Sequence, residues 1–301
     1  MIMLKRGSQP GYTLVELLVT MAILGLVASA VAGVYQVSQQ TYTRASSLEA
    51  AQVGARAGLD RMANELRLIG SYWVGADDAG NAITAATSTS ITFMANVDNV
   101  GALSVSNGTE VKVSTTASGT SVPLSISASD TADAFKVYTG SGSALNDWIY
   151  IANAGMREVK QIESISGSTL TLASALRSPY PVPPDTNVQN VLVRDIKTIT
   201  YARNATATST CPALTCLTRK QGGDNADPIV SNVSGLTFTY YGTTGSRLPL
   251  GQDQNPPPCP APGPNPDPNL IREIRIDLKV RGADGSPRCM ITRVRPRSLP
   301  W

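Results

Sequence analysis

The residue of this sequence most in need of a chemical explanation is a carboxylate at the head of a long apolar run. Glu16 is followed by the apolar residues Leu17 to Tyr35, and no further charged residue occurs before Arg44. A charged side chain inside a membrane helix costs on the order of 3 kcal/mol and is usually functional, with a partner. We therefore expect Glu16 to be neutralised by a positive group.

The four cysteines are the other residues whose chemistry the sequence specifies. They are Cys211, Cys216, Cys259 and Cys289. In an exported protein two disulfides are expected, and four cysteines allow three pairings. We favour Cys211 with Cys216 and Cys259 with Cys289, because each pair closes a short local loop. A zinc site is the alternative, but the chain has neither histidine nor paired CxxC spacing.

The lack of histidine also limits catalysis, because Ser-His-Asp and Cys-His mechanisms both need an imidazole. The acidic run Asp224 to Asp227 offers oxygen ligands but lacks the spacing of a recognised calcium loop. The basic C-terminal segment, with Arg288, Arg293, Arg295 and Arg297, is better explained as a solvated strand end than as a DNA contact. We therefore predict no enzymatic activity, no metal or other cofactor and no nucleic-acid partner.

The apolar run that carries Glu16 is long enough to cross a membrane. As a helix, Leu17 to Tyr35 would be about 28 Å long, close to the thickness of a bilayer core. Lys5 and Arg6 precede it and would hold the N-terminus on the cytoplasmic side. The run is too long and too uniformly apolar for the core helix of a soluble domain.

These residues resemble a known family. A basic leader ending at Gly11, then Tyr12-Thr13-Leu14-Val15-Glu16 before an apolar helix, is similar to the class III signal of type IV prepilins and pseudopilins. The resemblance implies that a prepilin peptidase cuts after Gly11 and that the new N-terminal amine of Tyr12 is methylated. It also implies that Glu16 meets the N-terminal amine of a neighbouring subunit during assembly.

Two other interpretations of the N-terminus remain. A secretory signal peptide would be cut after Ala28-Ser29-Ala30, although Glu16 within its apolar region argues against it. A plain uncleaved anchor would leave both Glu16 and the Gly11 junction without a purpose. Cleavage after Gly11, in contrast, removes Lys5 and Arg6 and creates an amine that can pair with a carboxylate, and such a pair is good at fixing register.

Beyond Tyr35 the helix is expected to continue as an amphipathic one to about Ile69, with Gly70 as its stop. A helix from Thr13 to about Ile69 would be about 85 Å long. Its apolar stripe at helical spacing consists of Leu48, Ala55, Leu59, Met62, Leu66 and Ile69. The end of this helix, Met62 to Tyr72, is also similar to that of PilW-like minor pilins and J-type pseudopilins.

Short apolar segments after the helix predict a β-rich head. The predicted strands are Ile91–Met94, Val111–Val113, Val122–Ile126, Trp148–Ala152, Glu158–Ile165, Thr169–Ala173, Val188–Tyr201, Pro228–Tyr241 and Ile271–Arg281. Ser166-Gly167-Ser168 is the expected hairpin turn. The last strand alternates apolar and charged residues, and we expect its charged face to be solvated.

The predicted fold class is therefore α+β, pilin-like, with a long N-terminal helix packed on an antiparallel sheet. The expected divisions are a leader at 1–11, a transmembrane or filament-core helix at 12–35, an amphipathic continuation at 36–70, and a head at 71–301 with Ser/Thr-rich and Pro-rich insertions.

The resemblance implies a minor pilin of the bacterial inner membrane, with its N-terminus in the cytoplasm and its head in the periplasm or on an extracellular pilus. Its partners would be prepilin peptidase, other pilins and the assembly platform, and its role structural, in pilus initiation or at the tip. A type II secretion pseudopilin is the alternative within the family. A membrane-tethered periplasmic enzyme or binding protein is the alternative of another class.

Overall fold

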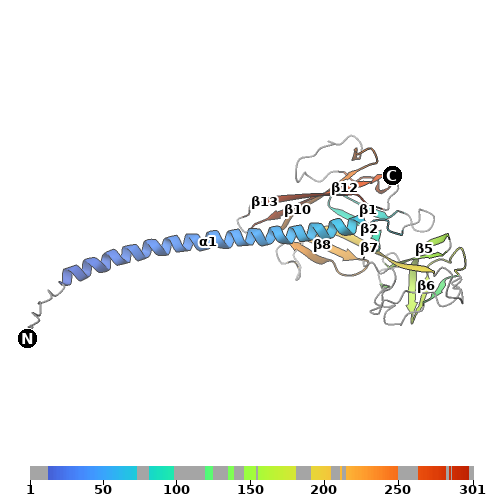
Figure 1. Ribbon diagram of the computed structural model, residues 1–301, viewed down its shortest axis with the longest axis horizontal. Coiled ribbons are helices and arrows are strands. Elements are labelled where there is room, and N and C mark those ends of the chain that lie inside the picture. Colours follow the sequence, from blue (N-terminus) through green and yellow to red (C-terminus); the bar gives the residue numbers. More distant parts are fainter. Residues whose placement is uncertain are drawn as a thin grey trace, which may run out of the picture. The chain divides into compact units, whose positions relative to one another are not determined.

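The computed structural model describes residues 13–72, 81–97, 119–124, 135–138, 146–153, 155–180, 191–204, 211, 215–249, 264–282, 285 and 287–297 (Figure 1). The chain divides into two compact units, Met1–Ala50 and Ala51–Trp301. The predicted strand Val111–Val113, the predicted cleavage residues Gly11 and Tyr12, and Cys259 lie outside the described residues.

One helix, α1 (Leu14–Arg67), carries the chain from the first unit into the second. It begins one residue later and ends two residues earlier than the sequence indicates. A turn follows to Tyr72, and within it Gly70 has a positive φ of 74°, the left-handed conformation that commonly ends a helix. The prediction that the helix stops at Gly70 is therefore confirmed.

The described strands form two antiparallel sheets. The first has the order β1-β2-β7-β4-β5-β6-β3, with β8 pairing with β7 and β9 with β8. The second has the order β11-β10-β12-β13. One long helix with antiparallel sheets is an α+β fold, as the sequence predicts.

The nine strands of the first sheet are β1 (Ile83–Ala86), β2 (Ser90–Ala95), β3 (Ser121–Pro123), β4 (Trp148–Asn153), β5 (Met156–Ser166), β6 (Thr169–Leu172), β7 (Leu192–Asn204), β8 (Cys216–Gln221) and β9 (Asp227–Ser231). The four of the second are β10 (Val233–Tyr241), β11 (Arg247–Leu248), β12 (Glu273–Arg281) and β13 (Pro287–Val294), and the short helix η2 (Pro268–Leu270) precedes β12.

Two local predictions about the strands have different outcomes. The hairpin between β5 and β6 is present, and Gly167 in its turn has a φ of 57°. The single strand predicted over Pro228–Tyr241 is wrong, because Asn232 takes a φ of 59° and divides it into β9 and β10, which belong to different sheets. Asparagine is among the few residues with a side chain that adopt this conformation readily.

The main hydrophobic core lies between the last turns of α1 and both sheets. Five of the six residues of the predicted apolar stripe are buried there, whereas Leu48 is half-buried. Gly58 allows the close approach, because a Cβ at this position would overlap the side chain of Val230 on β9. The remaining core comes mainly from β2, β10 and β12.

A second hydrophobic core lies under the part of the first sheet made by β3, β4, β5 and β6. The carboxylate of Glu158 is buried at its edge and accepts hydrogen bonds from the backbone of Arg177 (2.8 Å) and from the Tyr180 hydroxyl (3.1 Å). These bonds hold the segment after β6 against the core and supply the partners that a buried carboxylate requires.

β7 joins the two cores, because it pairs with β4 along its first residues and with β2 and β8 along its last. A buried ion-pair cluster occupies this junction. The Lys197 ammonium lies 2.6 Å from an oxygen of Asp195 and 2.8 Å from an oxygen of Asp147, which also accepts a hydrogen bond from the Lys136 backbone (2.7 Å). All three charged side chains are less than 5% exposed.

Burial shifts the ionisation of this cluster. It raises the pKa of the Asp147 carboxyl, and the opposing effect of Lys197 does not cancel the increase. Burial alone would lower the pKa of Lys197, but the adjacent carboxylates of Asp195 and Asp147 outweigh it, so that this pKa is raised. The ammonium is therefore the charge that permits two carboxylates to remain at the junction.

The expectation that the charged face of β12 is solvated is wrong for the middle of the strand, although Arg281 at its end is exposed. Arg275 and Asp277 are both buried and form a bidentate ion pair, with both N···O distances 2.9 Å. Neighbouring residues on the same sheet face, Thr237 and Thr239 of β10, are buried as well. The alternation of apolar and charged residues identified the strand correctly, but it did not reveal that the middle of the charged face is covered.

The contact at Gly58 yields a first prediction. Gly58→Ala should lower the free energy of unfolding by about 1–3 kcal/mol, because the methyl group overpacks against Val230. Gly54, on the same helix, has no atom within 4 Å of the position that a Cβ would occupy, so Gly54→Ala should instead stabilise by about 0.5–1 kcal/mol. Chemical denaturation of the full chain in detergent measures both changes. Changes of the same sign in the two variants would contradict this packing.

The junction yields a second prediction. Lys197→Met leaves two buried carboxylates without their cation and should cost about 3–5 kcal/mol at pH 7. The loss should be smaller at pH 4, because the Asp147 carboxyl, whose folded-state pKa is raised by burial, takes up a proton as the pH falls and then needs no cation.

Unfolding of the junction can be followed by the fluorescence of Trp148, which adjoins Asp147, in a chain whose other two tryptophans, Trp73 and Trp301, are replaced by phenylalanine. Lys136→Met is the control, because the Lys136–Asp224 pair is 3.0 Å long but about 40% exposed on both sides, and it should cost less than about 1 kcal/mol. Equal losses for the two variants, or a Lys197→Met loss that does not depend on pH, would disprove the role given to Lys197.

Candidate assembly site

The first turn of α1 is capped by the residue that precedes it. The backbone N–H of Glu16 donates a hydrogen bond to the Thr13 hydroxyl (3.3 Å), and the N–H of Leu17 donates one to the Thr13 carbonyl (3.2 Å). A threonine in this position satisfies one of the backbone donors that a helix start leaves free. Glu16 therefore occupies the first turn, where the helix dipole favours a negative charge.

The carboxylate of Glu16 has no ion-pair partner among the described residues. Its side chain is exposed, as are all its neighbours on the first turns of the helix. The chain from Leu17 to Thr43 contains no charged residue that could reach it from the same helix. A cation for Glu16 must therefore come from outside the part of the chain that the structure describes.

The helix around Glu16 presents apolar side chains on every side. Large residues such as Leu18 (63% exposed), Leu24 (70%) and Leu26 (73%) point away from the axis in different directions, and none is covered. The most apolar window of α1 has a mean hydropathy of 2.4, and no part of it is buried, so the helix is long and apolar enough to cross a membrane. A soluble monomer does not leave so large an apolar surface in water.

The C-terminal end of α1 is fixed by polar contacts with other residues of the same chain. Glu65 accepts a hydrogen bond from the Tyr201 hydroxyl (2.8 Å) and pairs with Arg219 of β8 (2.9 Å) and with Arg61 one turn earlier (3.2 Å). Burial, together with the Glu65 carboxylate, raises the pKa of Tyr201, so the hydroxyl remains a donor at neutral pH. No sequence pattern indicates this network, because Glu65 is one of several polar residues beside the stripe.

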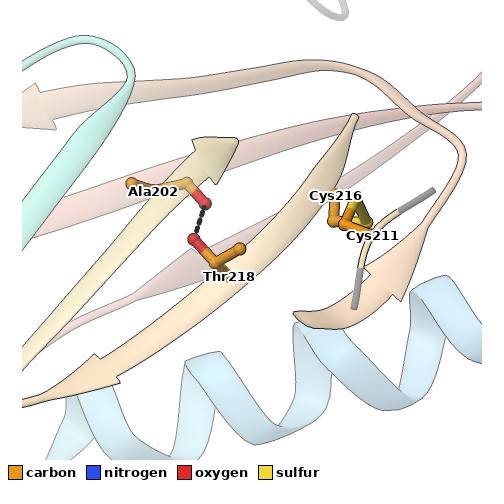
Figure 2. The surroundings of a disulfide bond; sticks show 4 residues. All are labelled: Ala202, Cys211, Cys216 and Thr218. Carbon is orange, nitrogen blue, oxygen red and sulfur yellow. Dashed lines mark hydrogen bonds between the residues drawn. A yellow bond between two sulfur atoms is a disulfide. The ribbon is translucent and has the colours of Figure 1, made fainter. Parts of the chain in front are cut away.

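The disulfide predicted between Cys211 and Cys216 is present and fully buried beside the start of β8 (Figure 2). Nearby, the Thr218 hydroxyl donates a hydrogen bond to the Ala202 carbonyl (3.0 Å), which helps to fix β8 on β7. Cys289 on β13 is disulfide-bonded too. Its predicted partner, Cys259, lies outside the described residues, so that pairing stays a prediction.

No group of His, Cys, Asp or Glu in the described part of the chain could hold a metal ion. Asp224, considered for calcium, instead forms an ion pair with Lys136. Arg293 and Arg295, from the basic C-terminal segment, pair with Glu273 of β12, Arg293 at 3.4 Å. These three charged residues are therefore paired within the head.

Comparison with known proteins finds a match at the N-terminus. Residues 6–32 match the family model described as the prokaryotic N-terminal methylation motif. The match supports a type IV pilin-like chain. Its motif implies processing by a prepilin peptidase and assembly with other pilins, and it points to a structural role.

The match ends within α1 and does not reach the head, so the likeness of the head to PilW-like minor pilins and J-type pseudopilins stays a prediction. No curated protein matches the chain, and no solved structure does. The motif and the apolar helix together suggest anchoring in the inner membrane, with the head in the periplasm or in a pilus.

Proposed function

We propose that this chain is a minor pilin. It is made as a prepilin, inserts in the bacterial inner membrane with its N-terminus in the cytoplasm, is cut after Gly11, and is then assembled into a type IV pilus with a structural role in initiation or at the tip. The observation that carries the proposal is the carboxylate of Glu16, which has no partner in the described part of the chain and heads an uncovered apolar helix within a methylation motif.

The exposed apolar surface of α1 could be covered in two successive environments, first the membrane and then the filament. In the membrane, lipid chains would cover the side chains that α1 leaves exposed. In a filament, the same side chains would pack against the helices of neighbouring subunits, which are as apolar as lipid. Replacing lipid by neighbouring helices would require no change in the head, because the main core of the head already covers the last turns of α1.

Glu16 would select the position of the subunit in the filament. Cleavage after Gly11 creates an amine at Tyr12, and the amine of a neighbouring subunit is a cation that could pair with Glu16. A pair of this kind contributes little net stability in apolar surroundings, but a shifted neighbour would leave a charge without a partner. The pair would therefore fix the register of each subunit. Cys211, Cys216, Cys259 and Cys289 would serve to stabilise the exported head.

The division of the chain follows from the same proposal. Residues 1–11 form the leader, 12–35 the membrane and filament-core helix, 36–70 its continuation into the head, and 71–301 the head with its Ser/Thr-rich and Pro-rich insertions. A type II secretion pseudopilin would use the same N-terminus. The filament with which the chain co-purifies distinguishes the two functions.

The processing step predicts the mature N-terminus. Mass spectrometry of the N-terminal peptide, on protein from its native membrane, should find Tyr12 as the first residue and one added methyl group on its amine. A chain that begins at Val31 would indicate a signal peptide, and an intact N-terminus would indicate a tethered periplasmic protein. Either result would refute the proposed maturation.

The assembly step predicts the effect of neutralising the carboxylate. Glu16→Gln should lower incorporation into filaments roughly tenfold or more, because the neighbouring amine then lacks its partner. Insertion in the membrane should be unchanged. Glu49→Gln is the matched control, since Glu49 is an exposed carboxylate on the same helix. The measurement is the ratio of chain in sheared filaments to chain in the membrane, and normal incorporation of Glu16→Gln would remove Glu16 from the mechanism.

A further inference from the structure

A buried lysine amine lies in contact with two carboxyl groups at the junction of the two cores. Nζ of Lys197 lies 2.8 Å from Oδ2 of Asp147 and 2.6 Å from Oδ2 of Asp195, and all three side chains are removed from solvent. An amine and a carboxyl group that a protein holds together can condense to an amide, because positioning greatly raises their effective concentration. Exclusion of water also removes the competing hydrolysis. The cluster therefore has both reactants of an amide bond in place.

The register of β4 and β7 holds these two reactants opposite each other. The ladder between the strands ends with Trp148 paired with Ile196, so the next position places Asp147 opposite Lys197. Asp195 precedes Lys197 by two residues on β7 and therefore shares its sheet face. The contact is thus set by paired backbone segments.

The backbone around Asp147 prepares its carboxyl group for attack. The N–H of Asp147 donates a hydrogen bond to the Lys136 carbonyl (3.1 Å), and the N–H of Ile162 donates one to the Asp147 carbonyl (3.0 Å), which fixes the residue. The N–H of Lys136 also donates to Oδ2 of Asp147 (2.7 Å) and would stabilise the negative charge that this oxygen gains when an amine adds to Cγ. Oδ1 is buried and accepts no hydrogen bond within the described chain, so it is the oxygen that can leave.

The protons of the cluster limit how often the amine can react. Lys197 holds its proton most of the time, because the adjacent carboxylates raise its pKa. Burial raises the pKa of Asp147, which makes this carboxyl the acceptor when the proton moves. The transfer turns an ion pair into a neutral amine and a neutral acid, which are less costly to keep away from water. A slow reaction suffices, because the bond needs to form only once in each chain.

We propose that Lys197 and Asp147 form an intramolecular amide bond after the head has folded, with the ion pair as the state before reaction. The bond between Nζ and Cγ forms and the bond between Cγ and Oδ1 breaks. The ammonium loses two protons, and they leave with Oδ1 as one water molecule. Asp195, which already contacts Nζ, would carry them and end the reaction unchanged. The step is redox-neutral and needs no co-reactant. The link would join positions 50 residues apart and tie β7 to the start of β4. The inference does not rest on the pilin assignment.

Lys160 is the other buried lysine among the described residues and provides an internal comparison. Its amine lies 3.5 Å from Oε2 of Glu158 on the same strand. Both oxygens of Glu158 accept hydrogen bonds from the backbone N–H of Arg177, at 3.0 and 2.8 Å. Neither oxygen is thus left without a donor, and the contact with the amine is longer. We therefore expect no amide bond at Lys160.

The first test is peptide mapping of the unaltered full chain, purified from its native membrane in detergent, then denatured, reduced and digested with trypsin. We expect mass spectrometry to find a branched peptide in which residues 137–157 are joined to residues 195–203, lighter than their sum by the mass of one water molecule. Lys197 should be closed to trypsin in this peptide.

Three other results of the mapping would overturn the proposal. Cleavage after Lys197 with every peptide at full mass would mean that no bond forms. A linear peptide of residues 195–203 that has lost one water would place the bond on Asp195. Loss of water from residues 137–157 with Lys197 still cleaved would mean that an aspartate has closed on its own backbone.

Variants separate the reaction from simple ion pairing. Lys197→Arg keeps a cation between the carboxylates, but its guanidinium is always protonated, so the branched peptide should be absent. Asp195→Asn keeps both bonded residues and should slow formation of the link at least tenfold, as measured by pulse labelling and mapping over time. Lys160→Arg is the control and should leave the yield unchanged. A link at an unchanged rate in Asp195→Asn would remove Asp195 from the reaction, and equal losses in Lys160→Arg and Lys197→Arg would refute the assignment.

Discussion

The constraint on which the structure depends is that α1 has two different surroundings along its length. Its first turns bury none of their apolar side chains within the described chain, whereas Ala55, Met62 and Leu66 are completely buried. The buried part is made possible by Gly58, which lets β9 approach the helix closely. The exposed part contains nothing that the head needs, so lipid or other subunits can cover it without disturbing the head.

The head buries charged side chains in ion pairs, at the junction of its two cores and on β12. β7 extends from the main core into the second one, and the residues at its midpoint are charged. Lys197 there lies between two carboxylates, and Arg275 and Asp277 on β12 form a second buried pair. Breaking such pairs is costly, although forming them contributes little net stability. The cluster on β7 also restricts the alternatives, because a shifted register of β7 would separate Lys197 from Asp147, while Asp195 would move with it.

The sequence predicted the elements that depend on local patterns. The long helix, its end at Gly70 and the β5–β6 hairpin all follow from periodicity and turn residues. Some strands were not found: β8 is rich in polar residues, and β13 mixes arginines with few apolar ones. Alternation in β12 predicted the strand but not its burial, because a sequence pattern shows which residues share a face and not what covers that face.

The candidate site, like the fold, has a part that the sequence predicted and a part that it did not. Glu16 was found because a carboxylate is anomalous among apolar residues, a property of the local sequence. Tyr201 and Arg219, the partners of Glu65 on the sheet, were missed because they lie more than a hundred residues away in the chain. Asp147, which pairs with Lys197, was missed for the same reason, because it lies 50 residues away. No local pattern encodes a contact of that kind.

Glu16 and Glu65 together show what a carboxylate on α1 requires. Glu65 lies where the helix is covered by the head, and its own chain provides a hydroxyl and two guanidinium groups. Glu16 lies where the helix is uniformly apolar and uncovered, and the described chain provides only the cap of Thr13. The free-energy cost of removing a carboxylate from water is the same at both ends. Under the proposed function, lipid chains would cover the first turns without bringing a cation to Glu16, whereas a neighbouring subunit would bring the amine of its N-terminus.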